Sequence, residues 1–451
     1  MTSPPPAGSI DVGRILDEGS WSGYQRVLVL LTASSIVFDG LDLQLLGVAL
    51  PSIMREWTLS RAAFATVFAS GLFGMMIGGA LAGMVGDRFG RRAALIGSVL
   101  TFGALTVATA AVNDLTALGL LRFFTGLGLG GALPNAAALA SEYVPRRHRP
   151  FAVTLTIVCI PLGGTLAGVL GLQVLPAHGW RTLYVIGGII PIATALMLFA
   201  LLPESPRFLA RHSRRWPELV RSLRRMGHAV APDASFVDPA EQAVAQGSMR
   251  ALLGRDFRAD TLALWGAYFS CMLGVYLGFN WVPAMLTGAG MSPTVASTGI
   301  TAYNLGGVFG AVCGALAFAR LGSKSTMLGM AAGSIAGALV LRSMPIGPTS
   351  AAEPIVGMLG ITGGLINAVQ TTMYALAAQV YPVGVRATGV GAAASVGRAG
   401  AIASTYAGAW ALEAGGSGLF FLLVAAAMLA ALVSLALVRR HIPAPTRGVN
   451  G

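Results

Sequence analysis

Apolar runs of membrane-crossing length recur along the whole chain and are separated by short polar stretches. A bilayer core about 30 Å thick needs about 20 apolar residues per helix. Runs of that kind, bounded by charged residues, Pro and Asn, lie at about 27–50, 62–85, 93–112, 115–140, 151–175, 182–203, 260–286, 294–319, 325–343, 354–379, 388–412 and 419–438. The pattern predicts an all-α membrane protein with twelve transmembrane helices.

A polar stretch divides these runs into six plus six. Residues 204–259 carry ten Arg and no apolar run of spanning length. We therefore expect an N-terminal segment (1–26), a first six-helix bundle (27–203), a central loop (204–259), a second bundle (260–438) and a tail (439–451). A weak repeat at an offset of 232, GGALAGMVGDRFGRRAALIG against GAVCGALAFARLGSKSTMLG, supports two related halves, which are typical of transporters.

The basic residues indicate how the chain is oriented. Of 30 Lys and Arg, 24 fall in segments that would face the cytoplasm, and four, Arg55, Arg61, Arg181 and Arg342, fall outside. An even number of spans then places both termini, the central loop and the tail in the cytoplasm. We expect a multi-pass protein of the inner membrane.

Composition narrows the function further. Charged residues make up 11% of the 451 residues, against about 25% in soluble domains, and 55% are hydrophobic, which excludes an ordinary soluble protein. The net charge is +12, but the charged residues lie between apolar runs, so we expect no nucleic-acid partner. With all three Cys inside apolar runs and all five His in loops or the tail, we expect no metal site, no enzyme activity and no cofactor beyond a coupling proton.

Two acidic residues lie deep in the first span. Asp39 and Asp42, in FDGLDLQ, are three residues apart and so share a helix face. Arg122 on the fourth span lies at a similar depth, roughly 12 Å from the outer face. A buried carboxylate costs several kcal/mol unless it is paired, protonated or hydrated, so we expect a charge network between these two spans.

This network has two interpretations. Asp39, Asp42 and Arg122 could neutralise one another and fix helix register. Alternatively, two carboxylates that face one guanidinium leave one acid without its own counter-charge, which favours the protonated form that a reversible proton carrier needs. We favour proton coupling through these three residues.

The second half offers a candidate substrate site. Arg398 lies near mid-depth in the eleventh span without a deep acid in its own half. Its planar fork of donors would suit a carboxylate ligand, or it could form a salt bridge to Asp39 or Asp42 across the molecule. Polar and aromatic residues of spans seven, eight and ten would suit a flat apolar ring with a polar edge; these are Tyr276, Asn280, Trp281, Tyr303, Asn304, Asn367, Gln370 and Tyr374.

The short loop GDRFGRR, after the second span, carries one acid among three bases. Asp87, Arg88, Arg91 and Arg92 could simply anchor the loop on the cytoplasmic side. The acid favours a second interpretation, a latch that pairs with a helix end and releases it when the two halves rock.

Several motifs carry a resemblance to a known family. The run G-x-x-x-D-R-x-G-R-R at 83–92 resembles the signature of the major facilitator superfamily. FDGLDLQ, RFFTGLGLGGALPNAAALASEYVP, PESPR and YPVGVRATGVGAAASVGRAG resemble the aromatic acid:proton symporter family. The resemblance implies proton-coupled import of a benzoate-like or hydroxybenzoate-like anion by alternating access, with Glu142 and Arg386 as further gating residues. We expect the chain to act as a monomer.

Other cargoes and roles remain open at this point. PESPR also occurs in sugar porters, so a sugar or polyol symporter is one alternative. CIPLGG in the fifth span departs from the G-P-x-x-G-G of drug efflux antiporters, which disfavours efflux. A non-transporting sensor of aromatic acids would need a sizeable cytoplasmic signalling domain, whereas the central loop is short and basic.

Overall fold

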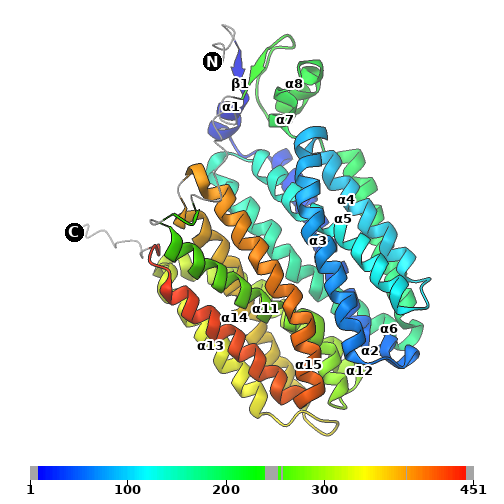
Figure 1. The fold of residues 1–451 in the computed structure, drawn as a ribbon. Coiled ribbons are helices and arrows are strands. Elements are labelled where there is room, and N and C mark those ends of the chain that lie inside the picture. Colours follow the sequence, from blue (N-terminus) through cyan, green and yellow to red (C-terminus); the bar gives the residue numbers. More distant parts are fainter. Residues whose placement is uncertain (1–8, 239–251, 255–256, 382, 443–451) are drawn as a thin grey trace.

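The computed structural model describes residues 9–238, 252–254, 257–381 and 383–442. Long helices run alongside one another, and short elements sit at one end of them (Figure 1). The elements are β1 (Ile10–Asp11), α1 (Val12–Glu18), α2 (Gly23–Trp57), α3 (Arg61–Phe89), α4 (Arg91–Thr109), α5 (Leu115–Glu142), η1 (Arg146–His148), α6 (Arg149–Leu201), α7 (Pro206–Ala210), η2 (Ser213–Arg215), α8 (Trp216–Arg225), β2 (Phe236–Val237), α11 (Arg258–Gly288), α12 (Pro293–Leu321), α13 (Ser323–Ser343), α14 (Ala352–Val380) and α15 (Val383–Leu437).

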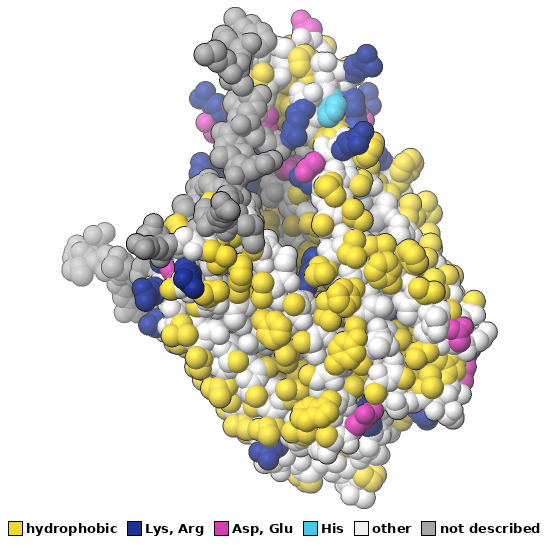
Figure 2. Space-filling model, in the orientation of Figure 1, with side chains coloured by type: hydrophobic (Ala, Val, Ile, Leu, Met, Phe, Trp, Pro, Cys, Tyr) yellow, Lys and Arg dark blue, Asp and Glu magenta, His cyan; other side chains and the backbone are white. Residues whose placement is uncertain are grey.

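Ten of these helices are long and apolar enough to cross a membrane. Large hydrophobic side chains cover the flank of the bundle, while Lys and Arg gather at the end that carries the short elements (Figure 2). Phe199, for example, is 65% exposed and Leu196 is 61% exposed. A soluble protein rarely exposes apolar patches this extensive, so the flank is suited to lipid.

Two of the ten helices are much longer than one crossing needs. Helix α6 has 53 residues and α15 has 55, so each would be about 80 Å long if it were continuous. Both are broken by a glycine with positive φ, Gly179 (φ 73°) and Gly416 (φ 59°), a conformation that glycine adopts without a β-carbon clash. The two breaks are 237 residues apart, one in the last long helix of each half.

The two halves of the chain are built alike. Helices α3 and α12 both have 29 residues and are followed directly by Gly90 and Gly322, which are 232 residues apart and both have positive φ. In the first half α2 packs on α6 and α3 on α5, and in the second α11 packs on α15 and α12 on α14. The weak repeat in the sequence is therefore a repeat of structure. The halves meet where α6 packs on α12, α3 on α15 and α2 on α11.

The N-terminal segment packs against the central stretch. Strand β1 pairs in parallel with β2, and buried apolar side chains of α1, α7 and α8 form one core cluster with the end of the first half. Asp17 of α1 forms an ion pair with Arg149 and lies 3.5 Å from Arg207. The N-terminal segment and the central stretch therefore lie together at one end of the bundle (Figure 1).

Glycines bring α3 and α5 into backbone contact. A β-carbon at Gly78 would lie 2.1 Å from the carbonyl oxygen of Leu127, and one at Gly126 would lie 2.1 Å from that of Gly71. Helices in lipid depend on such close approach because no hydrophobic effect drives them together.

Gly126→Ala should destabilise the first half, because the added methyl meets backbone that cannot move aside. We expect a loss of about 1–3 kcal/mol, measured as a lower thermal unfolding temperature in detergent. Gly119→Ala on the same helix is the control, since nothing lies within 4 Å of a β-carbon there. Equal unfolding temperatures for the two variants would contradict this packing.

Candidate functional site

Four helices of the first half converge on Asp42. This fully buried residue of α2 accepts a hydrogen bond from Thr106 of α4 and lies 3.3 Å from Nη1 of Arg122 on α5. The Arg122 guanidinium stacks over the Tyr184 ring of α6, 5.2 Å from its centroid. Sequence reasoning placed Asp42 beside Arg122 but missed Thr106 and Tyr184, because neither carries a charge that marks it in an apolar run.

Asp39 faces another part of the molecule. It is 4% exposed, and its Oδ1 has no hydrogen-bond partner among the described residues. It forms no ion pair with Arg122 in the described part of the chain, and the charged groups near enough to act on it are Asp42 and Arg398. The expected sharing of one guanidinium by both aspartates is therefore not what the structure has.

A central cavity between the two halves brings Asp39 and Arg398 together. Its other polar lining residues are Tyr276, Gln370 and Tyr374, and the rest of the wall is apolar apart from Gly130. Tyr374 packs edge-on against Tyr268, and Gln370 lies 3.4 Å from the Met272 sulfur. A mostly apolar wall with a few convergent polar groups is the usual character of a small-molecule site.

Arg398 reaches across the interface between the halves. Its Nη1 lies against Gly79 of α3, where a β-carbon would be 2.9 Å away. Within the described ranges Arg398 has no carboxylate oxygen within ion-pair distance, although it shares its cavity with Asp39. The salt bridge between Arg398 and Asp39 or Asp42 that the sequence also allowed is not formed among the described residues.

The other expected substrate residues lie elsewhere. Asn280 lines a small pocket of about 30 Å³ that Arg122 also lines and that adjoins the central cavity, since both contain Leu43, Met75 and Leu129. Trp281 packs against Phe68 with ring centroids 5.4 Å apart, and Tyr303 packs against Phe279. Asn367 donates to the Gly363 carbonyl oxygen at 2.9 Å. Of the eight polar and aromatic candidates, the structure brings Tyr276, Gln370 and Tyr374 to the central cavity.

Asn304 is engaged in a reciprocal amide pair. Its Nδ2 donates to Gln44 Oε1 at 2.7 Å, and Gln44 Nε2 donates to its Oδ1 at 2.9 Å. Both side chains are fully buried. The pair joins α2 to α12 and so connects the two halves inside the membrane. Gln44 was not predicted, because its partner lies 260 residues away in sequence.

The loop between α3 and α4 is held by two carboxylates. Within the described residues Asp87, near the end of α3, pairs at 2.5 Å with the side chain of Arg91, the first residue of α4, and accepts no backbone N–H of that helix. That task falls to Glu204, which accepts from the Arg92 backbone N–H at 3.0 Å. Gly90 has φ of 107°, and a β-carbon there would lie 2.1 Å from Glu204 Oε2, so glycine is required for both reasons.

The remaining residues of the predicted gate make separate contacts. Arg92 donates to the Phe199 carbonyl oxygen at 2.5 Å, and Glu142 accepts a hydrogen bond from Ser205. Arg88 is exposed and stacks on the Phe89 ring at 5.3 Å. Arg386, in the second half, donates to the Tyr381 carbonyl oxygen at 3.3 Å. The structure therefore distributes these residues over the ends of both halves.

Known proteins place the chain in a family. Residues 32–352 match the model of the Major Facilitator Superfamily, and the chain belongs to this superfamily. It is 33% identical to a gallate transporter of Pseudomonas putida over 96% of each chain. It is 35% identical to the 4-hydroxybenzoate transporter PcaK of the same organism over 90% of each chain. The family resemblance predicted from the motifs is confirmed.

Solved structures support the same fold. The chain resembles a partially occluded, inward-open xylose transporter XylE of Escherichia coli with a TM-score of 0.73 and 17% identity, covering 93% of this chain and 99% of that one. At this identity the likeness concerns the fold alone. The protein is a multi-pass inner-membrane transporter and not an enzyme.

The amide pair can be tested by a double-mutant cycle. Asn304→Leu alone should lower stability by about 1–3 kcal/mol, because Gln44 is left buried without its partner. Gln44→Leu/Asn304→Leu should recover most of this loss, and thermal unfolding in detergent measures both. A double variant as unstable as the single one would show that the pair does not act as a unit.

Proposed function

We propose that the protein imports an aromatic carboxylate together with protons by alternating access. The observation that carries this proposal is the central cavity, in which a buried carboxyl, Asp39, and a guanidinium, Arg398, meet across the two halves. Aromatic-acid cargoes in the names of the relatives support the substrate class. Tyr276 and Tyr374 supply the aromatic surface that a benzoate-like ring would contact.

We further propose twelve crossings with both termini in the cytoplasm. The breaks at Gly179 and Gly416 would turn α6 and α15 into two crossings each, which adds two to the ten long helices. The first bundle would then cover 27–203 and the second 260–438, with cytoplasmic segments at 1–26, 204–259 and 439–451. Residues 1–8, 239–251, 255–256 and 443–451 of those segments lie outside the described residues.

The substrate step follows from the donors of Arg398. A guanidinium can bind a carboxylate through two parallel hydrogen bonds, which fixes orientation as well as charge. The arriving anion would take the guanidinium as its counter-charge, and Asp39 would then stand in the same cavity without a positive neighbour. A carboxylate in that position is costly at mid-membrane, so anion binding would favour a proton on Asp39.

The proton step would involve the second carboxyl as well. Asp42 has Arg122 and Thr106 as partners, so its charge is compensated while Asp39 loses its own compensation. Occluded states that carry the anion without the proton, or the proton without the anion, would bury net charge. Only empty and fully loaded forms could then switch sides, which is the requirement for symport.

The gating set would act at the cytoplasmic ends of the halves. Asp87, Arg88, Arg91, Arg92 and Glu142 lie at the ends of α3, α4 and α5 in the first half, and Arg386 lies near the start of α15. Their short-range contacts hold each end in shape, and we propose that they rearrange when the halves rock. The scheme needs one chain, a proton and no further cofactor.

Uptake of labelled 4-hydroxybenzoate by cells that lack their own carrier tests the function. We expect accumulation and, in lightly buffered medium, alkalinisation that depends on the substrate. Asp39→Asn should abolish accumulation but retain exchange of internal for external substrate, because the neutral side chain mimics the protonated state. Asp233→Asn, an exposed acid, is the control. Full proton-driven uptake by Asp39→Asn would refute the assignment, and uptake of xylose instead would favour a sugar porter.

The place of Arg398 can be tested without removing its charge. Gly79→Ala should displace the guanidinium and raise the KM of uptake about three- to tenfold, equivalent to roughly 0.6–1.4 kcal/mol. Gly391→Ala, on the helix of Arg398 itself, has nothing within 4 Å of its β-carbon and serves as control. Identical KM values in both variants would remove Arg398 from the substrate site.

A further inference from the structure

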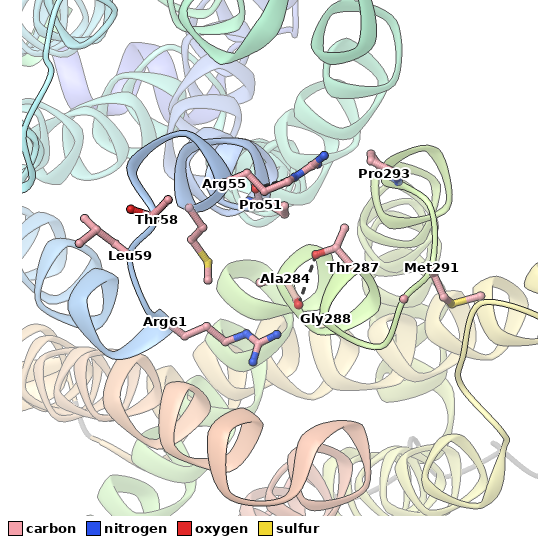
Figure 3. A pocket seen from close by; sticks show the side chains of 12 residues that line it. Pro51, Arg55, Thr58, Leu59, Arg61, Ala284, Thr287, Gly288, Met291 and Pro293 are labelled. Atoms are coloured by element: carbon pink, nitrogen blue, oxygen red, sulfur yellow. Dashed lines mark hydrogen bonds between the residues drawn. The ribbon is translucent and has the colours of Figure 1, made fainter.

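A further pocket opens between the halves at the end of the bundle away from the short elements. It lies between the loop that joins α2 to α3 and the loop that joins α11 to α12, with a volume of about 480 Å³ (Figure 3). That volume falls within the range of small-molecule sites. It is separate from the central cavity, because the two have no lining residue in common.

The pocket carries two positive charges and no acid. Arg55 and Arg61 are the charged residues among the twelve that line it. Basic residues are rare on the outer side of a membrane protein, and these are two of the four expected there. Arg181, by contrast, is held by Glu56 at 2.7 Å, and Arg342 is an exposed residue of α13.

Arg61 is packed against α11, but one of its guanidinium donors has no hydrogen-bond partner among the described residues. Its Nη2 lies against Gly288 of α11, where a β-carbon would be 1.9 Å away, and its Nε is buried without a hydrogen-bond partner in the part of the chain that the structure describes. Figure 3 shows its side chain extended across the pocket to Gly288. The nearby acid Glu413 accepts the Ala62 backbone N–H at 3.0 Å and so is engaged with the start of α3. A buried guanidinium nitrogen of this kind calls for an acceptor.

The remaining wall is mainly apolar. Met54, Leu59 and Met291 line it together with prolines of α2 and α12. A ligand that suits this pocket therefore combines an anionic group for the two guanidinium groups with a flat apolar body for the methionine and proline surfaces. A free inorganic anion would use the charges alone.

We propose that this pocket is an outer capture site for the aromatic carboxylate, occupied before the substrate reaches Arg398. The inference rests on the proposed function. The pocket lies beside the seam of α2 and α11, which must part for the cavity to open outward. A fixed positive site at such an entrance raises the local concentration of anions and speeds their arrival, in a manner that falls with ionic strength.

The capture site predicts an asymmetry between uptake and efflux. Arg55→Gln/Arg61→Gln should raise the KM for uptake from outside about fivefold, keep Vmax, and leave the KM for efflux from preloaded cells unchanged. Arg342→Gln removes the same kind of charge outside the pocket and should change neither constant. Gly288→Ala keeps both charges but displaces Arg61, and we expect it to raise the uptake KM as well.

Salt and a neutral probe complete the test. Raising the ionic strength should increase the uptake KM of the parent protein toward that of the double variant, whose own KM should stay flat. External 4-hydroxybenzamide, which has the ring without the charge, should not compete for capture. Equal uptake KM values for the double variant and Arg342→Gln, or equal KM shifts for uptake and efflux, would overturn the capture site. Failure of the parent protein to transport 4-hydroxybenzoate would instead overturn the proposed function.

Discussion

The ion pair between Asp42 and Arg122 is the interaction on which the rest of the first half depends. Both side chains are buried, and a charge in this environment is tolerated only with a partner, so each fixes the position of the other. Thr106 and Tyr184 complete the surroundings from α4 and α6. Four helices are thereby held in one relative arrangement around a compensated charge.

Helix α2 carries this fixed point and also the carboxyl that faces the second half. Gly40, between the two aspartates, lets α2 approach α6 closely, since a β-carbon there would lie 2.1 Å from the Ile160 carbonyl oxygen. Asp39 therefore lies next to a close backbone contact within its own half while it lines the cavity shared with Arg398. The Gln44–Asn304 pair lies further along the same helix and crosses the same interface. One helix thus brings the charge pair, the free carboxyl and a contact between the halves into register.

Hydropathy was sufficient to predict the long helices, because a bilayer imposes a length on every crossing. Charge was sufficient to place Asp42 with Arg122, since few charged residues occur at that depth. The separation of Asp39 from Asp42 was not predicted: positions three apart differ by about 60° around a helix, enough in a crowded interior to face different neighbours. The roles of Gln44 and Glu204, and the pairing of β1 with β2, depend on contacts between distant parts of the sequence. A local pattern carries no signal for such contacts.

The central claim is that anion and proton are bound together in the cavity of Asp39 and Arg398. Calorimetric titration of the purified protein with 4-hydroxybenzoate, repeated in buffers of different ionisation enthalpy, measures the number of protons exchanged on binding. The account predicts net uptake of about one proton per bound anion near neutral pH. Binding with no net proton exchange would contradict it.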